Sequence, residues 1–232
     1  MMSQGGAFIE EAYQEKPRAD LYSIVKKLRE MKTSHFRLLY VAEMKSAQEK
    51  ELNNYFLEFQ HKYEITGLLL IFNNLYVHLI EGEVDNIKLV CDDLQNQITT
   101  KSNLQHKSIY ILHFCEEKSE RLFDMWLCKS IAQSGSSKEI KSLPEHERYW
   151  TIYEGFMKIS DKIKKDKDKG KSEFGMTIKQ NASDLIPFGD ELVSVMTEQE
   201  MTMKEFIDFY FVPPDVVLEN EKIWPSAPDL TY

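Results

Sequence analysis

Hydrophobic residues alternate or run together in the central part of the chain, a pattern that predicts strands. His35–Tyr40 opens one strand, Ile65–Ile71 forms a second, and Tyr76–Gly82 is the return partner of the second. Asn73 and Asn74 separate these last two runs, and asparagine tolerates a positive φ angle better than most residues other than glycine. The sequence therefore predicts a tight two-residue hairpin.

Apolar residues recur at helical spacing before and after these strands, so each predicted helix has one face that must pack on something. Three helices are predicted, with these apolar residues: Asp20–Met31 (Leu21, Ile24, Val25, Leu28, Met31), a helix that follows a capping box at Ser46 and Glu49 (Leu52, Phe56, Phe59), and Val84–Ile98 (Ile87, Val90, Cys91, Leu94).

Two further strands complete a β-α-β-β-α-β order with one short addition. Ser108–Cys115 is apolar on both faces, as expected of a central strand, and Leu122–Trp126 is a short aromatic edge strand. This order predicts an α+β, ferredoxin-like fold, in which two helices lie on one face of an antiparallel or mixed sheet.

Beyond Ala132 the pattern changes to helices and polar connections. Helices are predicted at Glu147–Ile163, Asp190–Met196 and Met201–Tyr210, with a short strand at Val216–Leu218. The helix at Glu147–Ile163 has these apolar residues: Tyr149, Ile152, Tyr153, Phe156 and Met157.

The lysines of Lys158–Lys171 predict that the latter part of this stretch is a solvated, mobile linker. We expect four parts: a flexible N-terminal arm (1–18), the α+β domain with its preceding helix (19–131), a helix and Lys-rich linker (132–181), and a helical segment with an extended tail (182–232).

Composition narrows the class of protein. The 232 residues are 42% hydrophobic, enough for a sizeable core, and the net charge of −9 argues against a nucleic-acid-binding surface. Cys91, Cys115 and Cys128 lack paired metal spacing and are expected to be reduced thiols. No apolar run reaches the roughly 20 residues that span a bilayer, and the first residues do not resemble a secretory signal. We expect a soluble, intracellular protein.

Residues 35–129 resemble a BLUF domain, a light-sensing fold that holds flavin between its two helices, beneath a five-stranded sheet. Tyr40 in HFRLLY matches the tyrosine beneath the flavin ring, and Trp126 in RLFDMW matches the family's tryptophan. The family's asparagine falls on Gln60 and its methionine near the last strand on Cys128.

The photochemical glutamine of the family falls on His78 in YVHLIEG. A glutamine amide can exchange two hydrogen-bonding patterns, whereas a rigid imidazole cannot. We therefore expect no bound cofactor, with Tyr40, Gln60 and His78 half-buried and satisfied by backbone or water. The alternative is a flavin-binding sensor with altered photochemistry, in which His78 donates to a ring nitrogen.

A second resemblance covers most of the chain. The C-terminal segment EFIDFYFVPPDVVLENEKIWPSAP, with the ITGLLLIF run and the IEG turn, is similar to the testis-expressed protein 47 family. The matching residues are Phe206, Phe209, Tyr210, Trp224, Pro225 and Pro228, whereas residues 132–181 match nothing. The resemblance implies a scaffold of the motile ciliary or sperm flagellar axoneme, at or near radial spokes, and hence a cytoskeletal location.

The sequence gives little support for an enzymatic function. The six histidines (His35, His61, His78, His106, His113, His146) include no metal-binding spacing, although His78 and His113 could approach each other on neighbouring strands. An acylphosphatase-like site needs an arginine beside an asparagine to hold phosphate. Arg37 is the only arginine in a predicted strand, and it has no evident partner of this kind. The glutamates Glu116, Glu117 and Glu120 are interpreted as a solvated turn. We expect no catalytic residue and no metal.

The C-terminal tail is a candidate surface for binding a partner protein. It carries large apolar groups that either pack back on the domain or contact a partner: Phe211, Val216, Ile223 and Trp224. Partners are expected to be axonemal proteins, among them radial spoke components, with neither nucleic acid nor membrane.

The lysines of Lys158–Lys171 could tether the chain to the acidic microtubule surface. Replacing four of them with glutamine should then reduce sedimentation with microtubules: Lys164, Lys165, Lys167 and Lys169.

Overall fold

A computed structural model describes residues 35–45, 49–100, 106–118, 120–132, 139–171, 173–198 and 201–212. All of them belong to one compact unit, Ser34–Tyr232. Several predicted features lie outside the described residues: the arm at 1–18, the helix at Asp20–Met31, the capping residue Ser46, the strand at Val216–Leu218 and the tail.

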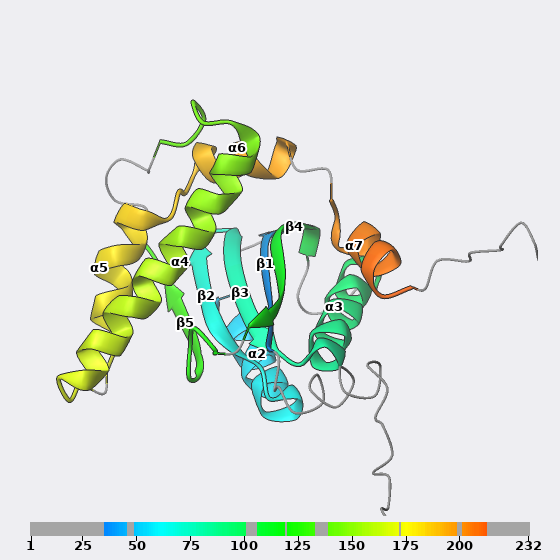
Figure 1. The fold of residues 1–232 in the computed structure, drawn as a ribbon. Coiled ribbons are helices and arrows are strands. Elements are labelled where there is room, and N and C mark those ends of the chain that lie inside the picture. Colours follow the sequence, from blue (N-terminus) through cyan, green and yellow to red (C-terminus); the bar gives the residue numbers. More distant parts are fainter. Residues whose placement is uncertain are drawn as a thin grey trace, which may run out of the picture. The chain divides into compact units, whose positions relative to one another are not determined.

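Five strands form one mixed sheet in the order β4-β1-β3-β2-β5 (Figure 1). Their bounds are β1 (His35–Met44), β2 (Thr66–Phe72), β3 (Leu75–Gly82), β4 (His106–Lys118) and β5 (Trp126–Ser130). All neighbours are antiparallel except β2 and β5, which are parallel. The first four strands have the ferredoxin-like order, so the predicted fold class is confirmed.

The predicted hairpin joins β2 and β3. Phe72 pairs with Leu75, which leaves a two-residue turn, and Asn73 has a φ of 54°. Gly67 near the start of β2 has a φ of 146°, and a Cβ there would lie 2.0 Å from the carbonyl oxygen of Leu79. The close approach of the two strands therefore requires glycine at this position.

Two helices cover one face of the sheet, as predicted. α2 (Glu49–Tyr63) and α3 (Val84–Thr99) bury the apolar residues expected from their spacing: Leu52, Phe56, Phe59, Ile87, Val90, Cys91 and Leu94. The strand residues beneath them alternate with those of the other face, because successive side chains of a strand point to opposite sides.

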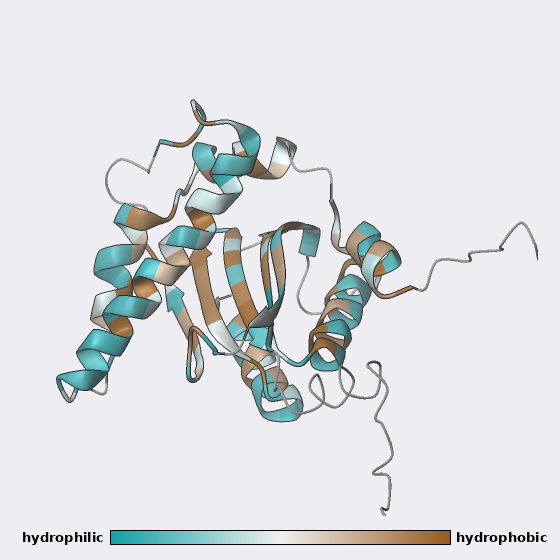
Figure 2. Cartoon of the chain, in the orientation of Figure 1, coloured by the Kyte–Doolittle hydropathy of each residue, from teal (hydrophilic) through white to brown (hydrophobic). Residues whose placement is uncertain are grey.

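Three more helices cover the other face: α4 (Glu145–Asp168), α5 (Gly175–Leu185) and α6 (Asp190–Glu198). The predicted end of this helix at Ile163 is wrong, since α4 continues to Asp168; the latter part of the lysine-rich stretch is largely exposed, as predicted, but most of it is helical and not a linker. Its apolar stripe persists among the lysines, with Ile159 and Ile163 buried, and this packing holds the helix together. Figure 2 shows brown strands beneath α4 and teal along its outer turns.

Both outer strands differ from their predictions. β4 is an edge strand and not a central one; it is apolar on both faces because α3 and α7 (Met203–Tyr210) pack on one and α4 on the other. Along its edge, the amide of Ile111 donates to the carbonyl oxygen of Met201, 2.9 Å away. At the opposite edge, the strand begins at Trp126, while Leu122–Met125 lies outside any strand.

α7 begins at a capping box. The Thr202 hydroxyl accepts from the amide of Glu205, whose carboxylate accepts from the amide of Thr202. Among the described residues, no helix is long and apolar enough to cross a bilayer.

Candidate functional site

The structure brings together three of the four residues at flavin-equivalent positions. Tyr40 on β1 and His78 on β3 are cross-strand partners, and the Tyr40 hydroxyl lies 2.7 Å from His78 Nδ1. Trp126 Nε1 on β5 donates to His78 Nε2 at 3.0 Å. We call Tyr40, His78 and Trp126 the aromatic triad. Gln60, on the last turn of α2, is partly exposed and does not contact them through any hydrogen bond that the structure describes.

The hydrogen bonds fix the protonation of the triad. Because the indole N–H donates to Nε2, that nitrogen carries a lone pair, so the neutral imidazole holds its proton on Nδ1 and donates it to the Tyr40 oxygen. Burial lowers the pKa of His78 to about 3. Burial also raises the pKa of Tyr40 well above its usual value. The triad is therefore neutral at physiological pH.

Aromatic rings fill the space between the triad and α2. The ring of Phe56 lies 4.5 Å from that of His78 and stacks on Trp126 at 6.0 Å, measured between centroids. Tyr76 also contacts Phe56 edge-on, with centroids 6.4 Å apart, and its hydroxyl is 2.7 Å from His106 Nε2. Tyr40, Phe56, Tyr76 and His78 have no exposed surface.

These residues do not fit a flavin. A cofactor site needs a hollow with convergent polar groups that are free to bind the ligand. Here a phenyl ring occupies the space against the sheet, and the polar atoms of the triad bind each other. The prediction that Tyr40 and His78 are half-buried and satisfied by backbone or water is wrong, because both are fully buried and satisfied by side chains. Phe56 was predicted as a core residue, but its contact with His78 could not be read from helical spacing.

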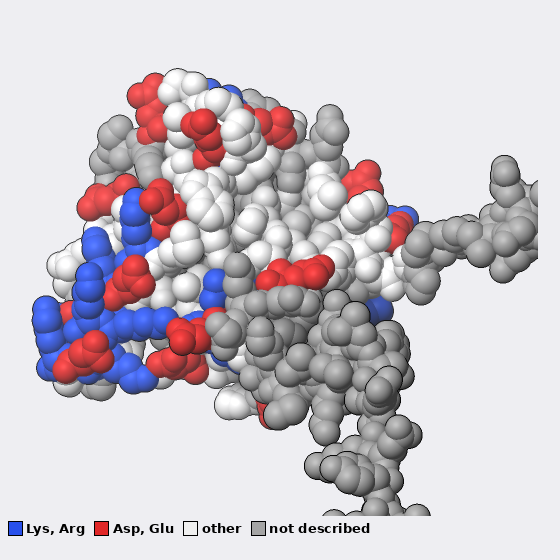
Figure 3. Space-filling model, viewed as in Figure 1, with Lys and Arg blue, Asp and Glu red and all other residues white. Residues whose placement is uncertain are grey.

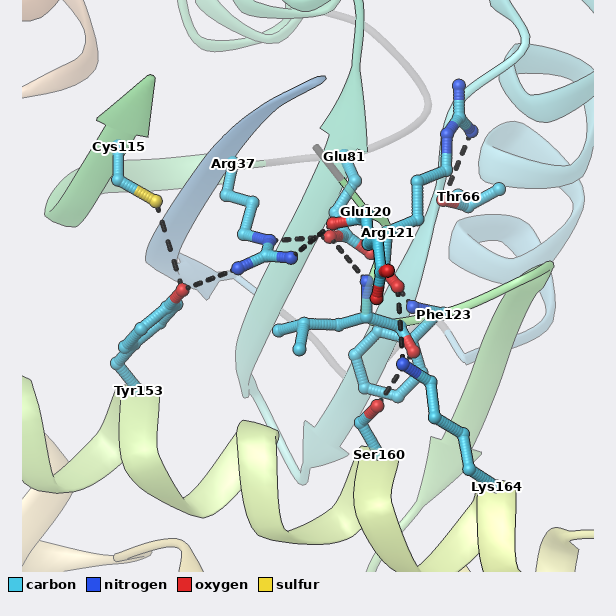
Figure 4. Close-up of polar contacts among 11 residues, drawn as sticks. Arg37, Thr66, Glu81, Cys115, Glu120, Arg121, Phe123, Tyr153, Ser160 and Lys164 are labelled. Carbon is cyan, nitrogen blue, oxygen red and sulfur yellow. Dashed lines mark hydrogen bonds and ion pairs between the residues drawn. The ribbon is translucent and has the colours of Figure 1, made fainter. Parts of the chain in front are cut away.

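A second polar centre lies on the opposite face of β1 and β3 (Figure 4). Arg37 Nε donates to Glu81 Oε1 at 2.6 Å, and the two residues are cross-strand partners. The same guanidinium donates to the Tyr153 hydroxyl of α4 at 3.1 Å and to the carbonyl oxygen of Glu120 at 2.6 Å. Burial alone would lower the pKa of Arg37, but the hydrogen bonds to Glu81 and Tyr153 outweigh it and raise that pKa.

Glu81 holds the loop that precedes β5. Its carboxylate accepts from the amides of Leu122 and Phe123, at 2.8 and 2.9 Å. From the α4 side, Ser160 Oγ donates to the Leu122 carbonyl oxygen at 2.7 Å, and Lys164 Nζ to that of Arg121 at 3.4 Å. The loop is thus fastened between sheet and helix. The partner of Arg37 is a glutamate 44 residues away on a neighbouring strand, and not the asparagine that an acylphosphatase-like site would need.

The remaining candidates are dispersed. His78 and His113 lie on strands separated by β1 and on opposite faces, where His113 packs 4.5 Å from the Tyr153 ring, so they cannot share a metal. Glu116 lies in β4 and accepts from the Tyr210 hydroxyl, so it does not belong to a turn. Among the residues that the structure describes, no cluster of three or more His, Cys, Asp or Glu side chains could hold a metal ion.

The end of α7 combines packed and exposed aromatic residues. Phe211, predicted to bind a partner, packs on Phe206 and Tyr210 with centroids 5.7 and 5.0 Å apart. Phe209 is 80% exposed and Val212 is 52% exposed. The other tail candidates, Val216, Ile223 and Trp224, lie outside the described residues.

Several solved structures resemble this chain. A bacterial light-regulated adenylyl cyclase is 23% identical over 52% of this chain, with a TM-score of 0.35. Klebsiella pneumoniae BlrP1, solved with FMN and cyclic diGMP, is 16% identical over 43% of this chain and 26% of that chain, with a TM-score of 0.34. BlrB, a BLUF protein in its dark state, is 21% identical over 43% of this chain and 74% of that chain, with a TM-score of 0.32.

The chain spans only about a third of the cyclase, 34% of its length. No curated protein matches the chain at a significant level. The sequence model of the family described as Testis-expressed protein 47 matches residues 34–211. The match includes the region 132–181 that offered no resemblance by motif, and it ends before Trp224. Because it spans more than half of the sequence, the chain belongs to the testis-expressed protein 47 family.

Proposed function

We propose that this protein is a non-enzymatic structural and interaction protein of the motile ciliary or flagellar axoneme, associated with radial spokes. Family membership supports a role in testis, where flagella are assembled. The proposal places the protein in the cytoplasm and cytoskeleton of the cilium or flagellum. It makes other axonemal proteins its partners, in a large complex, with the microtubule surface as a further contact.

The closed aromatic triad carries this proposal. In an enzyme or sensor, polar side chains converge on a hollow that substrate or cofactor fills. Here the polar atoms of Tyr40, His78 and Trp126 hydrogen-bond to one another, and Phe56 fills the space beside them. A fold with its interior used in this way contributes through its outer surfaces.

One such surface lies at the end of α7. Phe209 exposes 80% of its surface, and the apolar tail residues Val216, Ile223 and Trp224 follow it later in the sequence. Exposed aromatic residues are frequent anchors in protein interfaces. We propose that Phe209 and the tail contact an axonemal partner.

Crosslinking mass spectrometry of detergent-extracted axonemes tests the proposal. We expect the protein to stay with the extracted axoneme and to form crosslinks with radial spoke proteins. Recovery of the full chain in the detergent-soluble fraction, without axonemal crosslinks, would contradict it. A Trp224→Ala variant should lose part of its retention, whereas Trp150→Ala, a change to an exposed tryptophan of α4, serves as the matched control.

Absorption spectroscopy tests the sensor alternative directly. Purified protein that contains oxidised flavin would absorb at about 450 nm. We expect colourless protein that stays folded and does not take up added flavin. Flavin bound in stoichiometric amounts would overturn the proposed function.

A further inference from the structure

Basic side chains gather on the second half of α4, although the chain as a whole has a net charge of −9. Seven lysines and three aspartates lie between Lys158 and Lys171. Figure 3 shows blue side chains concentrated over this end of the helix, at the left of the view. The lysines fall into two sets with different surroundings.

The inner set makes contacts within the protein. Lys164 Nζ donates to the Arg121 carbonyl oxygen at 3.4 Å, and Lys167 Nζ lies 2.5 Å from Asp124. Lys171 Nζ lies 2.9 Å from Asp166. Lys164 and Lys167 therefore contact the loop before β5, and Lys171 contacts a carboxylate of α4 itself.

The outer set consists of Lys158, Lys162, Lys165 and Lys169, all of which are exposed. Their spacing of four, three and four residues places them on one face of the helix. Lys158 pairs with Glu154 at 2.9 Å and Lys162 donates to Asn181 of α5. Lys165 and Lys169, near the end of the helix, complete this outer lysine stripe.

The stripe is carried by a firmly held helix. Gly155 allows α4 and α5 to approach so closely that a Cβ there would lie 2.5 Å from Ile186 Cδ1 and 2.8 Å from the Leu185 carbonyl oxygen. Asp166 contacts Lys171 and Thr177, and its hydrogen bonds to Thr177 and Lys171 lower its pKa most, but it also lies close enough to Lys169 for that charge to lower its pKa further. The carboxylates on this part of α4 are Glu154, which pairs with Lys158, and Asp161, Asp166 and Asp168.

We propose that the outer lysine stripe binds an extended acidic segment of a partner protein. From Lys158 to Lys169 the helix rises about 16 Å, which is the length of about five residues of an extended strand. Ammonium groups at this spacing match glutamate or aspartate side chains along such a segment. The stripe contains lysine and no arginine, which disfavours bidentate phosphate recognition. The overall negative charge opposes a long polyanion or an anionic membrane.

This inference rests on the proposed interaction role, and two charge-matched variants of the full chain test it. Lys165→Gln/Lys169→Gln changes the outer stripe, and Lys164→Gln/Lys167→Gln changes the inner set; each removes two positive charges. The probe is a fluorescein-labelled peptide of eight glutamates, followed by fluorescence anisotropy at about 25 mM and about 250 mM salt.

We expect the outer pair to weaken peptide binding about tenfold at low salt and the inner pair less than about twofold. Equal weakening by both pairs would overturn the inference, as would absence of binding to the unmodified chain. Tighter binding of duplex DNA or phosphatidylserine vesicles than of the peptide would overturn the choice of ligand. Circular dichroism verifies that α4 is intact in each variant. If the unmodified protein is not retained in extracted axonemes, the proposed function is refuted. That result leaves the peptide-binding measurement, and so the inference about the stripe, unaffected.

Discussion

The strands β1 and β3 carry one polar pair on each face of the sheet, and the two pairs behave differently. On the side of α2 and α3, Tyr40 and His78 are uncharged and complete their hydrogen bonds within the layer, through Trp126. On the side of α4, Arg37 and Glu81 are charged and bind backbone and side chains of other segments. The neutral pair closes a space, whereas the charged pair joins two layers.

The difference follows from what surrounds each pair. Rings of Phe56, Tyr76 and Trp126 provide few further hydrogen-bonding groups, so a charge on His78 would be left without compensation. The loop at 120–123 offers a carbonyl oxygen to Arg37 and amides to Glu81, which satisfies both ions. In this protein, the buried pair that keeps its charges is the one that backbone groups of a neighbouring loop can reach.

Breaking the charged pair should have the largest effect. Arg37→Met leaves Glu81 buried without its ion partner, and we expect a loss of about 3–5 kcal/mol in the free energy of unfolding. Urea unfolding followed by tryptophan fluorescence measures it. The double variant Arg37→Met/Glu81→Leu should recover part of the loss, and additive effects of the two changes would contradict the coupling.

Acidification should lower the stability of the protein through the neutral pair, Tyr40 and His78. The pKa of His78 is about 3 in the folded state and about 6.5 when the chain is unfolded, so between these values the unfolded state binds the extra proton. Stability from this group is complete above about pH 6.5 and is lost as the pH falls toward 3. We expect up to about 3 kcal/mol between pH 7 and pH 4.

His78→Gln supplies the control for this pH effect, because its amide can accept from Trp126 and does not titrate. The variant should lose less stability on acidification than the unmodified chain does. Parallel pH profiles of the two proteins, measured by chemical unfolding, would show that His78 does not cause the acid sensitivity.

Removing one hydroxyl from the triad should have a smaller effect. Tyr40→Phe leaves the Nδ1–H of His78 without its acceptor, at a cost of about 1–3 kcal/mol. Thermal unfolding measures the change, with Tyr63→Phe at a partly exposed position of α2 as comparison. Equal destabilisation by the two variants would argue against a special role for the triad.

The ion pair between Lys167 and Asp124 should contribute least. It fastens the same loop as Arg37 and Glu81 do, but both side chains are more than half exposed. Solvent screens such a pair, so Lys167→Gln should leave the unfolding midpoint unchanged within experimental scatter. A loss comparable to that of Arg37→Met would mean that the loop depends on its outer contact.

Local patterns predicted much of the fold and the place of the candidate site. The asparagines of the hairpin, the spacing of Leu52 and Phe56, and the order of strands and helices each depend on neighbours in sequence. The match of Tyr40, His78 and Trp126 to a family pattern located a centre that the structure brings together.

Features that depend on distant residues could not be predicted in the same way. The pairing of Arg37 with Glu81 requires the register of β1 on β3. The extension of α4 from Ile163 to Asp168 could not be predicted, because residues 164–169 are all lysine or aspartate and give no apolar pattern. β4 resembled a central strand because the helices that cover its two faces come from separate parts of the chain.

The short contact between β4 and residues 201–202 has a consequence for crowded assemblies. Exposed strand edges are templates on which identical molecules add to one another and polymerise. Here Tyr110 bridges to Thr202 and the amide of Ile111 is already bonded, so the middle of this edge is taken by backbone of the same molecule. Addition of another copy along the middle of β4 therefore requires that this segment first detach.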